Sequence, residues 1–376
     1  MIYLDNAATS YPKPEPVYRR VDEVLRHVGG NPGRGSHRMA LSAGRVIFEV
    51  RESIARLLNI KDSGRVAFTK NATESINLAL KGLLKSGDHV VTTAVEHNAV
   101  VNTIKGLEKK GIKATMVGMG ENGTIGPKEI DDAVGKNTRL VCITHASNVL
   151  GTILPVGDVG TICRRKGVPL MVDAAQTVGA VPIDVETMNI DILAGTGHKA
   201  LFGPQGTGFL YIREGIDIPP LIDGGTGEVR ESIDIPERLE SGTINTPGIS
   251  GLGAGVEFLM KEGVVRVREY EENLIGHIID ELNGIKGISI IGTLDASKRV
   301  SLVSFNIADR DPGEIGYLLD NEFGIMTRSG LHCAPSAHRA AGTYPGGAVR
   351  VSPGYFNSSS DIEEFIGVVR KIAVRV

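Results

Sequence analysis

Short runs of β-branched and aliphatic residues alternate with helix-length amphipathic segments between about residues 64 and 213. The apolar runs are 65–69, 89–94, 113–119, 139–144, 169–175, 191–197 and 207–213. This alternation predicts a mostly parallel sheet with helices on both faces. Ligands of such sheets bind beyond the carboxyl ends of the strands, so the residues that follow each run are the first candidates for chemistry.

The rest of the chain forms an irregular segment and a smaller α+β unit. Residues 214–248 are rich in Pro and Gly and show little periodicity, which indicates a long loop region. One long helix is expected from about Ile249 to Leu282, followed by short strands and a C-terminal helix. We therefore predict an α/β protein with a large domain at 15–250 and a small domain formed by 1–14 and 251–376.

Composition and charge narrow the class of protein. The 376 residues are 41% hydrophobic and 23% charged, which is typical of a globular protein. Forty-one basic and 44 acidic side chains give a formal charge of −3, so neither nucleic acid nor an acidic membrane is expected as a partner. The N-terminus lacks a signal-peptide pattern and no long apolar run occurs, which predicts a cytoplasmic location.

The three cysteines, Cys142, Cys163 and Cys333, are odd in number and widely spaced along the chain. They form no C-x-x-C motif, which disfavours a disulfide framework and a zinc site. Cys142 lies in an apolar run and Cys163 in a helical segment, so both are predicted to be core residues. Residues 118–123 match G-x-G-x-x-G, but no helix opens at once and no acidic residue ends a second strand, so we interpret them as a turn.

The segment 194–211 places Lys199 in a glycine-punctuated turn directly after a strand. A partly desolvated lysine there suits a Schiff base with an aldehyde, although an isolated lysine is more often a solvated surface residue. Asp173 also follows an apolar strand, where an unpaired carboxylate is costly. Alone, Asp173 is also typical of a helix cap or metal ligand. Together the two residues favour a pyridoxal phosphate site, in which an acid pairs with the pyridine nitrogen.

Further polar residues stand at other strand ends or on short strands. Ala72 and Thr73 open a helix whose free amides suit a phosphate, although an ordinary helix cap gives the same pattern. His97 and Asn148 each follow a strand, and a core histidine is the usual alternative for the former. Arg350, on a short strand near the C-terminus, suits a substrate carboxylate or an ordinary surface position.

Cys333 lies in the loop 328–338 between His332 and a proline. Arg328 and His332 are expected to stabilise a thiolate there and make Cys333 nucleophilic. The alternatives are a metal pair of Cys333 with His332 or His338, and an inert structural thiol.

These motifs, in this order, resemble the class V aminotransferase branch of the fold type I pyridoxal phosphate enzymes, and specifically the cysteine desulfurases. The resemblance rests on 3–10, 37–38, 71–77, 96–100, 147–152, 172–177, 195–199, 239–243, 328–334 and 349–352. The R-x-G-x-H-C-A form is similar to the group II enzymes of the SufS and selenocysteine lyase type rather than to the IscS type. Leu331 stands where histidine is common in that group, and 335–347 departs from the usual continuation.

The resemblance implies three overlapping sets of site residues. The cofactor set is Ala72, Thr73, His97, Asn148, Asp173, Gln176, Thr196, His198, Lys199 and, from the opposite subunit of a homodimer, Thr243. The substrate set is Asn6, Ala7, Ala8, Asn148, Arg328 and Arg350. The catalytic set is Lys199, Cys333 and His97, and no metal is implied.

The roles implied for these residues are specific. Lys199 would bind the cofactor covalently, Asp173 would pair with the pyridine nitrogen and Gln176 would donate to the ring phenolate oxygen. His97 would stack on the ring, and Cys333 would carry the sulfur as a persulfide. His97 and His332 are both candidate proton donors.

The implied reaction converts L-cysteine to L-alanine, with transfer of the sulfur from Cys333 to an acceptor protein that the sequence does not identify. L-Selenocysteine is a further candidate substrate. The first alternative is a selenocysteine lyase or an epimerase of the same fold in which Cys333 is dispensable. More remote alternatives are an NAD-binding dehydrogenase that uses 118–123 and a non-catalytic sulfur-trafficking protein.

Overall fold

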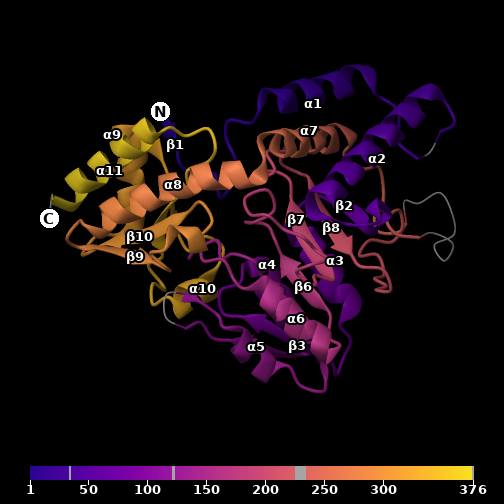
Figure 1. Cartoon of the computed structure of the whole chain (residues 1–376), viewed down its shortest axis with the longest axis horizontal. Helices are drawn as coiled ribbons and strands as arrows, with labels where there is room; N and C mark the ends of the chain where they lie inside the picture. The colour runs from indigo at the N-terminus through magenta and orange to yellow at the C-terminus, as the bar shows by residue number, and fades with distance from the viewer. Residues whose placement is uncertain (34, 121–122, 225–233, 375–376) are drawn as a thin grey trace.

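A seven-stranded sheet lies at the centre of the larger of two lobes, on the right of Figure 1. Its strand order is β2 (Val66–Thr69), β8 (Gly208–Ile212), β7 (Ile192–Thr196), β6 (Leu170–Asp173), β5 (Thr138–Thr144), β3 (His89–Thr93) and β4 (Lys113–Val117). Strand β8 is antiparallel to both neighbours, and the other pairs are parallel. The computed structural model describes residues 1–33, 35–120, 123–224 and 234–374. The predicted mostly parallel sheet is confirmed.

Helices cover both faces of this sheet because successive strand residues point to opposite sides. In β5, Leu140 and Cys142 belong to the core beneath α3 (Ala72–Leu83) and α4 (Asn98–Glu108). Val141 and Ile143 belong to the opposite core, beneath α2 (Arg38–Leu58), α6 (Val156–Lys166) and α7 (Thr246–Glu262). The shorter α5 (Pro127–Ala133) packs against α6.

Two helices precede the alternating segment at 64–213 and were not predicted from the sequence. Helix α1 (Glu15–His27) buries only Val17 and Val24, so its apolar signal is sparse. Helix α2 begins after His37, whose side chain accepts a hydrogen bond from the Ala40 amide. Both helices pack against α7.

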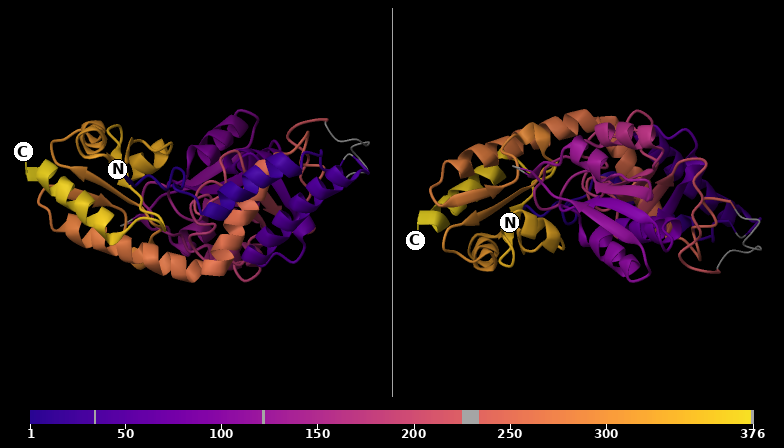
Figure 2. Two further views of the ribbon diagram at one scale, coloured as in Figure 1. Left: turned by 90° about the horizontal axis from the view of Figure 1, so that it is seen from above. Right: turned by 90° about the horizontal axis from the view of Figure 1, so that it is seen from below.

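The smaller lobe is an antiparallel sheet with helices, as predicted for the C-terminal part of the chain. Its strand order is β12 (Arg328–Gly330), β13 (Ala348–Val351), β10 (Val303–Ile307) and β9 (Ile288–Ile291). Helices α8 (Val264–Asn283), α9 (Pro312–Phe323) and α11 (Ser359–Val374) pack with it, and α10 (Pro335–Ala340) follows the loop of Cys333. Strand β1 (Ile2–Tyr3) pairs with β11 (Ile325–Met326), so the N-terminus joins this lobe. Figure 2 shows the two lobes as the two ends of the molecule.

The prediction of a single long helix from Ile249 to Leu282 is wrong, because the helix is interrupted at Gly263. Gly263 has φ 86°, a left-handed backbone conformation that non-glycine residues rarely adopt. Helix α7 before the break packs on α1 and α2 of the large lobe, whereas α8 after it packs against the small lobe. We therefore propose a domain boundary at Gly263 in place of residue 250.

Two predicted irregular segments lie partly outside the described residues. The turn at 118–123 lacks positions 121–122, and the loop region at 214–248 lacks 225–233. Helix α5 begins at Pro127, too late for a dinucleotide-binding turn that opens directly into a helix.

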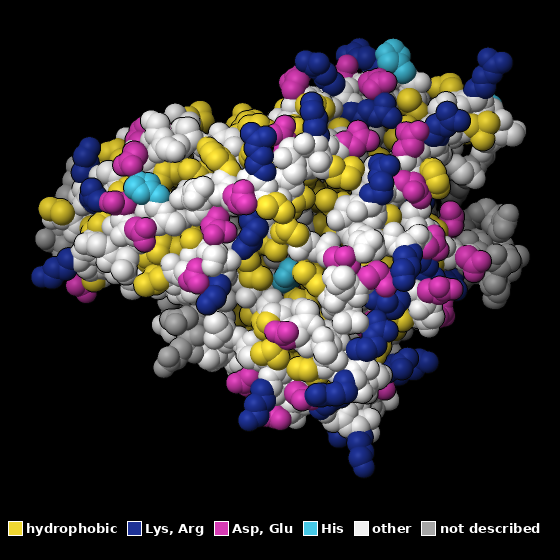
Figure 3. Space-filling view, in the orientation of Figure 1, with side chains coloured by type: hydrophobic (Ala, Val, Ile, Leu, Met, Phe, Trp, Pro, Cys, Tyr) yellow, Lys and Arg dark blue, Asp and Glu magenta, His cyan; other side chains and the backbone are white. Residues whose placement is uncertain are grey.

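The surface carries both signs of charge. On the face in Figure 3, basic and acidic side chains are interspersed over both lobes. Among the described residues, no helix is both long enough and apolar enough to cross a membrane.

Candidate active site

A cavity of about 280 Å³ lies at the carboxyl ends of the central strands, where the two lobes meet. It brings together most of the predicted site residues: Ala7, Ala8, Ala72, Thr73, His97, Asn148, Asp173, Gln176, Thr196, His198, Lys199, Arg328 and Arg350. This convergence follows from the parallel topology, because the strand ends meet at one edge of the sheet. We call this space the main cavity.

Lys199 and Asp173 provide opposite charges in the main cavity. Asp173 ends β6, is 4% exposed, and accepts a hydrogen bond from the Ala175 amide at 3.0 Å. Burial raises the pKa of Asp173, and Lys199 opposes that shift. Burial and the charge of Arg350 lower the pKa of Lys199 to about 8, so a neutral amine is accessible near physiological pH.

Two residues that line the main cavity carry buried polar atoms without a hydrogen-bond partner among the described residues. Thr196 Oγ1 and His198 Nδ1 are buried and find no hydrogen-bond partner within the described part of the chain. The N-terminus of α3 faces the same space through Ala72 and Thr73, whose amides have no acceptor within the helix. A helix N-terminus with uncompensated donors favours an anion, and these residues fit the phosphate of the cofactor implied by Lys199 and Asp173.

His97 caps α4 and is half-buried on the wall of the main cavity. Its Nδ1 accepts a hydrogen bond from the Ala99 amide at 3.1 Å, which assigns the proton of the neutral ring to Nε2. Burial, followed by the charge of Lys199, lowers the pKa of His97 to about 4. His97 is therefore a neutral ring at physiological pH.

Arg350 is held on the small-lobe side by a network that the sequence did not indicate. This side chain is 1% exposed, and its Nη2 pairs with Asp5 Oδ1 at 2.8 Å. Its Nη1 donates to the Asn148 carbonyl at 3.1 Å, whereas Nε and the Asn148 Oδ1 have no partner in the described residues. Arg350 therefore retains donors for a carboxylate. Asp5 was missed because nothing local links an N-terminal acid to a residue near the C-terminus.

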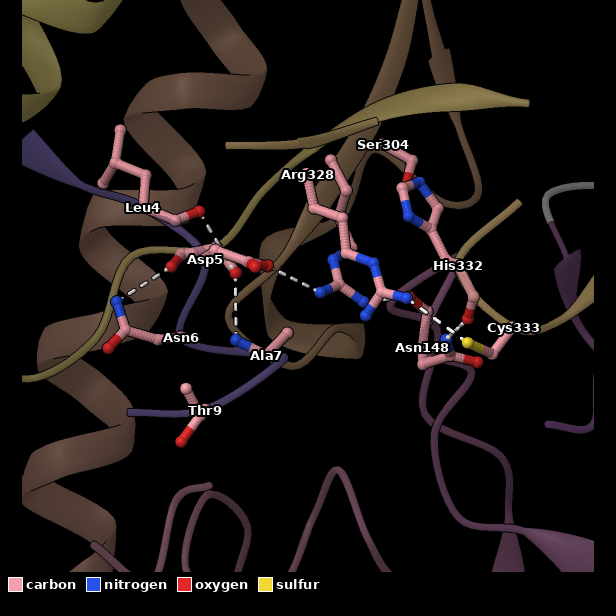
Figure 4. Close-up of polar contacts among 12 residues, drawn as sticks. Leu4, Asp5, Asn6, Ala7, Thr9, Asn148, Ser304, Arg328, His332 and Cys333 are labelled. Carbon is pink, nitrogen blue, oxygen red and sulfur yellow. Dashed lines mark hydrogen bonds and ion pairs between the residues drawn. The ribbon is translucent and has the colours of Figure 1, made fainter. Parts of the chain in front are cut away.

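The side chain of Cys333 is exposed, and the loop that carries it is tied to the large lobe (Figure 4). Arg328 Nη2 lies 3.3 Å from Cys333 Sγ. The Cys333 carbonyl accepts from the Asn98 amide at 2.9 Å, and the His332 carbonyl accepts from Asn148 Nδ2 at 2.7 Å. Both His332 and Cys333 have positive φ, 48° and 58°, a strained conformation that concentrates at functional sites.

The expectation that His332 supplies positive charge to Cys333 is wrong. His332 is 2% exposed, and burial followed by Arg350 lowers its pKa to about 2, so the ring is neutral. Its ring lies 5.4 Å from that of His338, which is also buried. Across the described residues, no group of three His, Cys, Asp or Glu side chains could hold a metal ion. Arg328 is therefore the cation beside the Cys333 thiol.

Asn6, Thr243 and Cys333 do not line the main cavity, whereas Gln176 lines it but is hydrogen-bonded within the protein. Asn6 lines a neighbouring small cavity, and its amide bonds to Ser352, Asn357 and Tyr11. Gln176 reaches the main cavity but its Nε2 donates to the Ala7 carbonyl at 3.2 Å. Thr243 is exposed and lines a separate cavity of about 150 Å³. Cys142 and Cys163 are buried, as predicted.

The family model for class-V aminotransferases matches residues 2–365, and the chain belongs to that family. A probable cysteine desulfurase of Methanothermobacter thermautotrophicus is 36% identical, over 99% of this chain and 94% of its own length. A cysteine desulfurase IscS of Clostridium botulinum is 33% identical with the same coverage. The apo structure of cysteine desulfurase from Thermococcus onnurineus NA1 superposes with a TM-score of 0.94 at 34% identity, covering 100% of this chain and 95% of that chain.

Family membership identifies the cofactor that the protein uses. The protein is an enzyme that depends on pyridoxal 5′-phosphate, with the fold type I architecture predicted from its motifs. This result removes the basis for the dehydrogenase interpretation of residues 118–123.

Proposed function

We propose that the protein is a cysteine desulfurase that converts L-cysteine to L-alanine and retains the released sulfur as a persulfide on Cys333. The observation that carries this proposal is the position of Arg328, which lines the main cavity and contacts Cys333 Sγ at 3.3 Å. An exposed thiol thus stands at the edge of a site that has Lys199 inside it. The cysteine desulfurases to which the chain is similar support the same activity.

In this proposal the large lobe holds the cofactor. Lys199 would bind pyridoxal phosphate covalently, and Asp173 would accept a hydrogen bond from its protonated ring nitrogen. Thr196, His198 and the α3 amides would hold the phosphate, where the structure leaves donors unpaired. When bound, the cofactor supplies an electron sink for negative charge at the substrate α-carbon.

The small lobe would bind and orient the substrate carboxylate. Arg350 has a free Nε donor, and Asn148 lies beside it. Because Asp5 fixes one side of the Arg350 guanidinium, the remaining donors have a defined direction. Asn6 is not assigned to the substrate, since its amide is already bonded within the protein.

Lys199 and Cys333 would carry out the bond changes on the substrate. Lys199, with a pKa lowered to about 8, takes and returns protons at carbon. The Cys333 thiolate forms a bond to the substrate sulfur while the carbon–sulfur bond breaks, and protonation at carbon gives alanine. His97, neutral at physiological pH, donates from Nε2 rather than acting as a cation.

The Cys333→Ala variant tests this proposal. We expect it to retain pyridoxal phosphate, fixed on Lys199 by borohydride, but to release almost no alanine from L-cysteine. The control is Cys142→Ala, because that thiol is buried and should leave turnover unchanged. Alanine release at the wild-type rate by Cys333→Ala would instead favour the selenocysteine lyase or epimerase.

We further propose a homodimer of the group II type that passes its sulfur to an acceptor protein. Exposure of Cys333 supports a protein acceptor, and exposure of Thr243 supports its use by the opposite subunit. The cavity that contains Thr243 also exposes Leu221 and Ile222, at 41% and 49%. Light scattering should give about twice the chain mass of 40.0 kDa. A monomer that binds pyridoxal phosphate tightly would contradict the shared site.

A further inference from the structure

A second, smaller cavity of about 40 Å³ adjoins the main cavity. Ala7, Gln176 and Lys199 line both spaces, so Lys199 borders the main cavity and the small one. Glu271, on α8, also lines the small cavity. Glu271 is 9% exposed and has no part in the function proposed above.

The small cavity has room and polar partners for water. A cavity needs at least about 10–15 Å³ of such volume to hold a buried water, so 40 Å³ has room for at least one. Ser301 Oγ donates to the Pro353 carbonyl at 2.7 Å, and Ser10 Oγ donates to the His198 carbonyl at 3.3 Å. Both serines line the cavity. Ser10 Oγ also accepts from Lys13 Nζ at 3.0 Å, and each hydroxyl oxygen keeps a lone pair that can accept from water. With Glu271 and Lys199, they provide the polar contacts that a short water chain needs.

A narrow space of about 10 Å³ lies next to Glu271. It shares Glu271, Ala180 and Ser301 with the small cavity and is also lined by Arg268 and Glu272. Arg268 and Glu272 lie 3.8 Å apart, with side chains 19% and 33% exposed. Glu271 therefore lines both the small cavity and the space beside this partly exposed ion pair.

We propose that Glu271 is a positioning residue that exchanges protons with Lys199 through water in the small cavity. This inference rests on the assignment of Lys199 as the cofactor-binding lysine. When Lys199 is an ammonium, its proton passes along the water to the Glu271 carboxylate, leaving a neutral amine and a carboxylic acid. The reverse transfer restores the ammonium and the carboxylate, so no other reactant is needed.

Burial brings the pKa values of Glu271 and Lys199 close to each other. Burial raises the pKa of Glu271 to about 8, against the smaller opposing effects of the Tyr355 amide and Arg268. Burial, then Arg350, lowers the pKa of Lys199 to about 8. Because both pKa values are about 8, neither group holds the proton much more strongly than the other, and transfer can run in both directions. The charged groups that line the cavities around Glu271 are Arg268, Glu272, Arg299 and Lys199.

Three variants test this connection. Glu271→Gln removes the proton-accepting group, and Ala180→Val fills the water space while leaving Glu271 in place. Glu269→Gln is the matched control, because Glu269 is an exposed acid on the same helix. The first readout is the rate at which each apoprotein attaches pyridoxal phosphate, which requires a neutral Lys199 and does not depend on desulfurase activity. The second is kcat for alanine release, and the third is the infrared band of a protonated carboxyl group.

We expect Glu271→Gln and Ala180→Val to slow cofactor attachment and kcat by about tenfold, less than the effect of a directly acting acid or base. The KM for L-cysteine should stay within about twofold. The infrared signal of protonated carboxyl groups should fall in Glu271→Gln and stay unchanged in the control and in Ala180→Val. Burial also raises the pKa of Glu96 to about 8, so Glu96 supplies signal that remains in every variant. Wild-type attachment in Glu271→Gln, or a defect in Glu271→Gln that Ala180→Val does not share, would overturn the proposal. A wild-type protein that attaches the cofactor but makes no alanine would instead contradict the desulfurase assignment alone.

Discussion

Removal of the Glu240 carboxylate is expected to destabilise the large lobe. Glu240 accepts two hydrogen bonds from Arg51 Nη2, at 2.7 and 2.9 Å, and one from the Phe68 amide at 2.7 Å. The two charged side chains are 9% and 7% exposed. Arg51 also donates from Nε to the Val66 carbonyl at 2.8 Å, and its guanidinium lies 5.1 Å from the Phe68 ring centroid. This cluster joins α2, β2 and the loop that leads to Thr243.

The expected loss of unfolding free energy follows from the groups that lose their hydrogen-bond acceptor in Glu240→Ala. A buried guanidinium and a buried amide both lose their acceptor, and breaking such a pair costs about 3–5 kcal/mol. A cooperative unit of about 250 residues has an unfolding entropy near 0.5 kcal/mol per kelvin, so Tm should fall by about 6–10 °C.

Scanning calorimetry of the apoprotein measures this change. Glu237→Ala, which alters an exposed acid three positions earlier, is the control and should shift Tm by about 1 °C or less. The double variant Arg51→Met, Glu240→Leu should recover most of the loss, because no charge then remains buried. The reasoning is refuted if Glu240→Ala lowers Tm by less than about 2 °C, or if the double variant is as unstable as the single one.

Three further predictions concern the site and its pH dependence. Asp173→Asn should retain pyridoxal phosphate but lose most alanine release, because an amide does not stabilise a protonated ring nitrogen; near wild-type turnover would contradict this role. Arg328→Ala should slow alkylation of Cys333 by iodoacetamide by about tenfold while Cys142 stays unreactive, and an unchanged rate would show that the 3.3 Å contact is irrelevant. Burial lowers the pKa of His145 to about 4, below its unfolded value of about 6.5, so its contribution to stability is present above pH 6.5 and is lost as the pH falls toward 4. In urea unfolding between those pH values, His145→Gln should reduce the loss of stability by about 1.4 kcal/mol per pH unit, and an unchanged slope would argue against a buried neutral ring.

The central sheet and the main-cavity residues at its strand ends were predictable, because each depends on a sequence pattern within a short segment of the chain. Each strand is a short apolar run that ends in a polar or small residue, as Asp173 in β6 and Thr196 in β7 illustrate. Parallel topology then brings these ends to one edge without any knowledge of side-chain contacts. The helix break was also visible in principle, because Gly263 interrupts an otherwise continuous helical pattern.

The contacts between lobes could not be predicted in the same way. The pair of Asp5 with Arg350 joins residues 345 positions apart, and no periodicity connects them. His332 was expected to be a cation because it adjoins Cys333, but neighbours in sequence can differ completely in burial. At this pair the positive φ values turn His332 inward and Cys333 outward. Only the packed loop decides which side chain meets solvent.

The proposed site residues come from both lobes, so catalysis depends on how the lobes pack together. The large lobe supplies Lys199 and Asp173, whereas Arg350, Arg328 and Cys333 come from the small lobe. Asn148 connects the two, since its carbonyl accepts from Arg350 and its side chain donates to the His332 carbonyl. A displacement of the small lobe would therefore move together Arg350, proposed to bind the carboxylate, and Cys333, proposed to accept the sulfur. Correct docking of the lobes is thus as necessary for sulfur transfer as any single side chain in the main cavity.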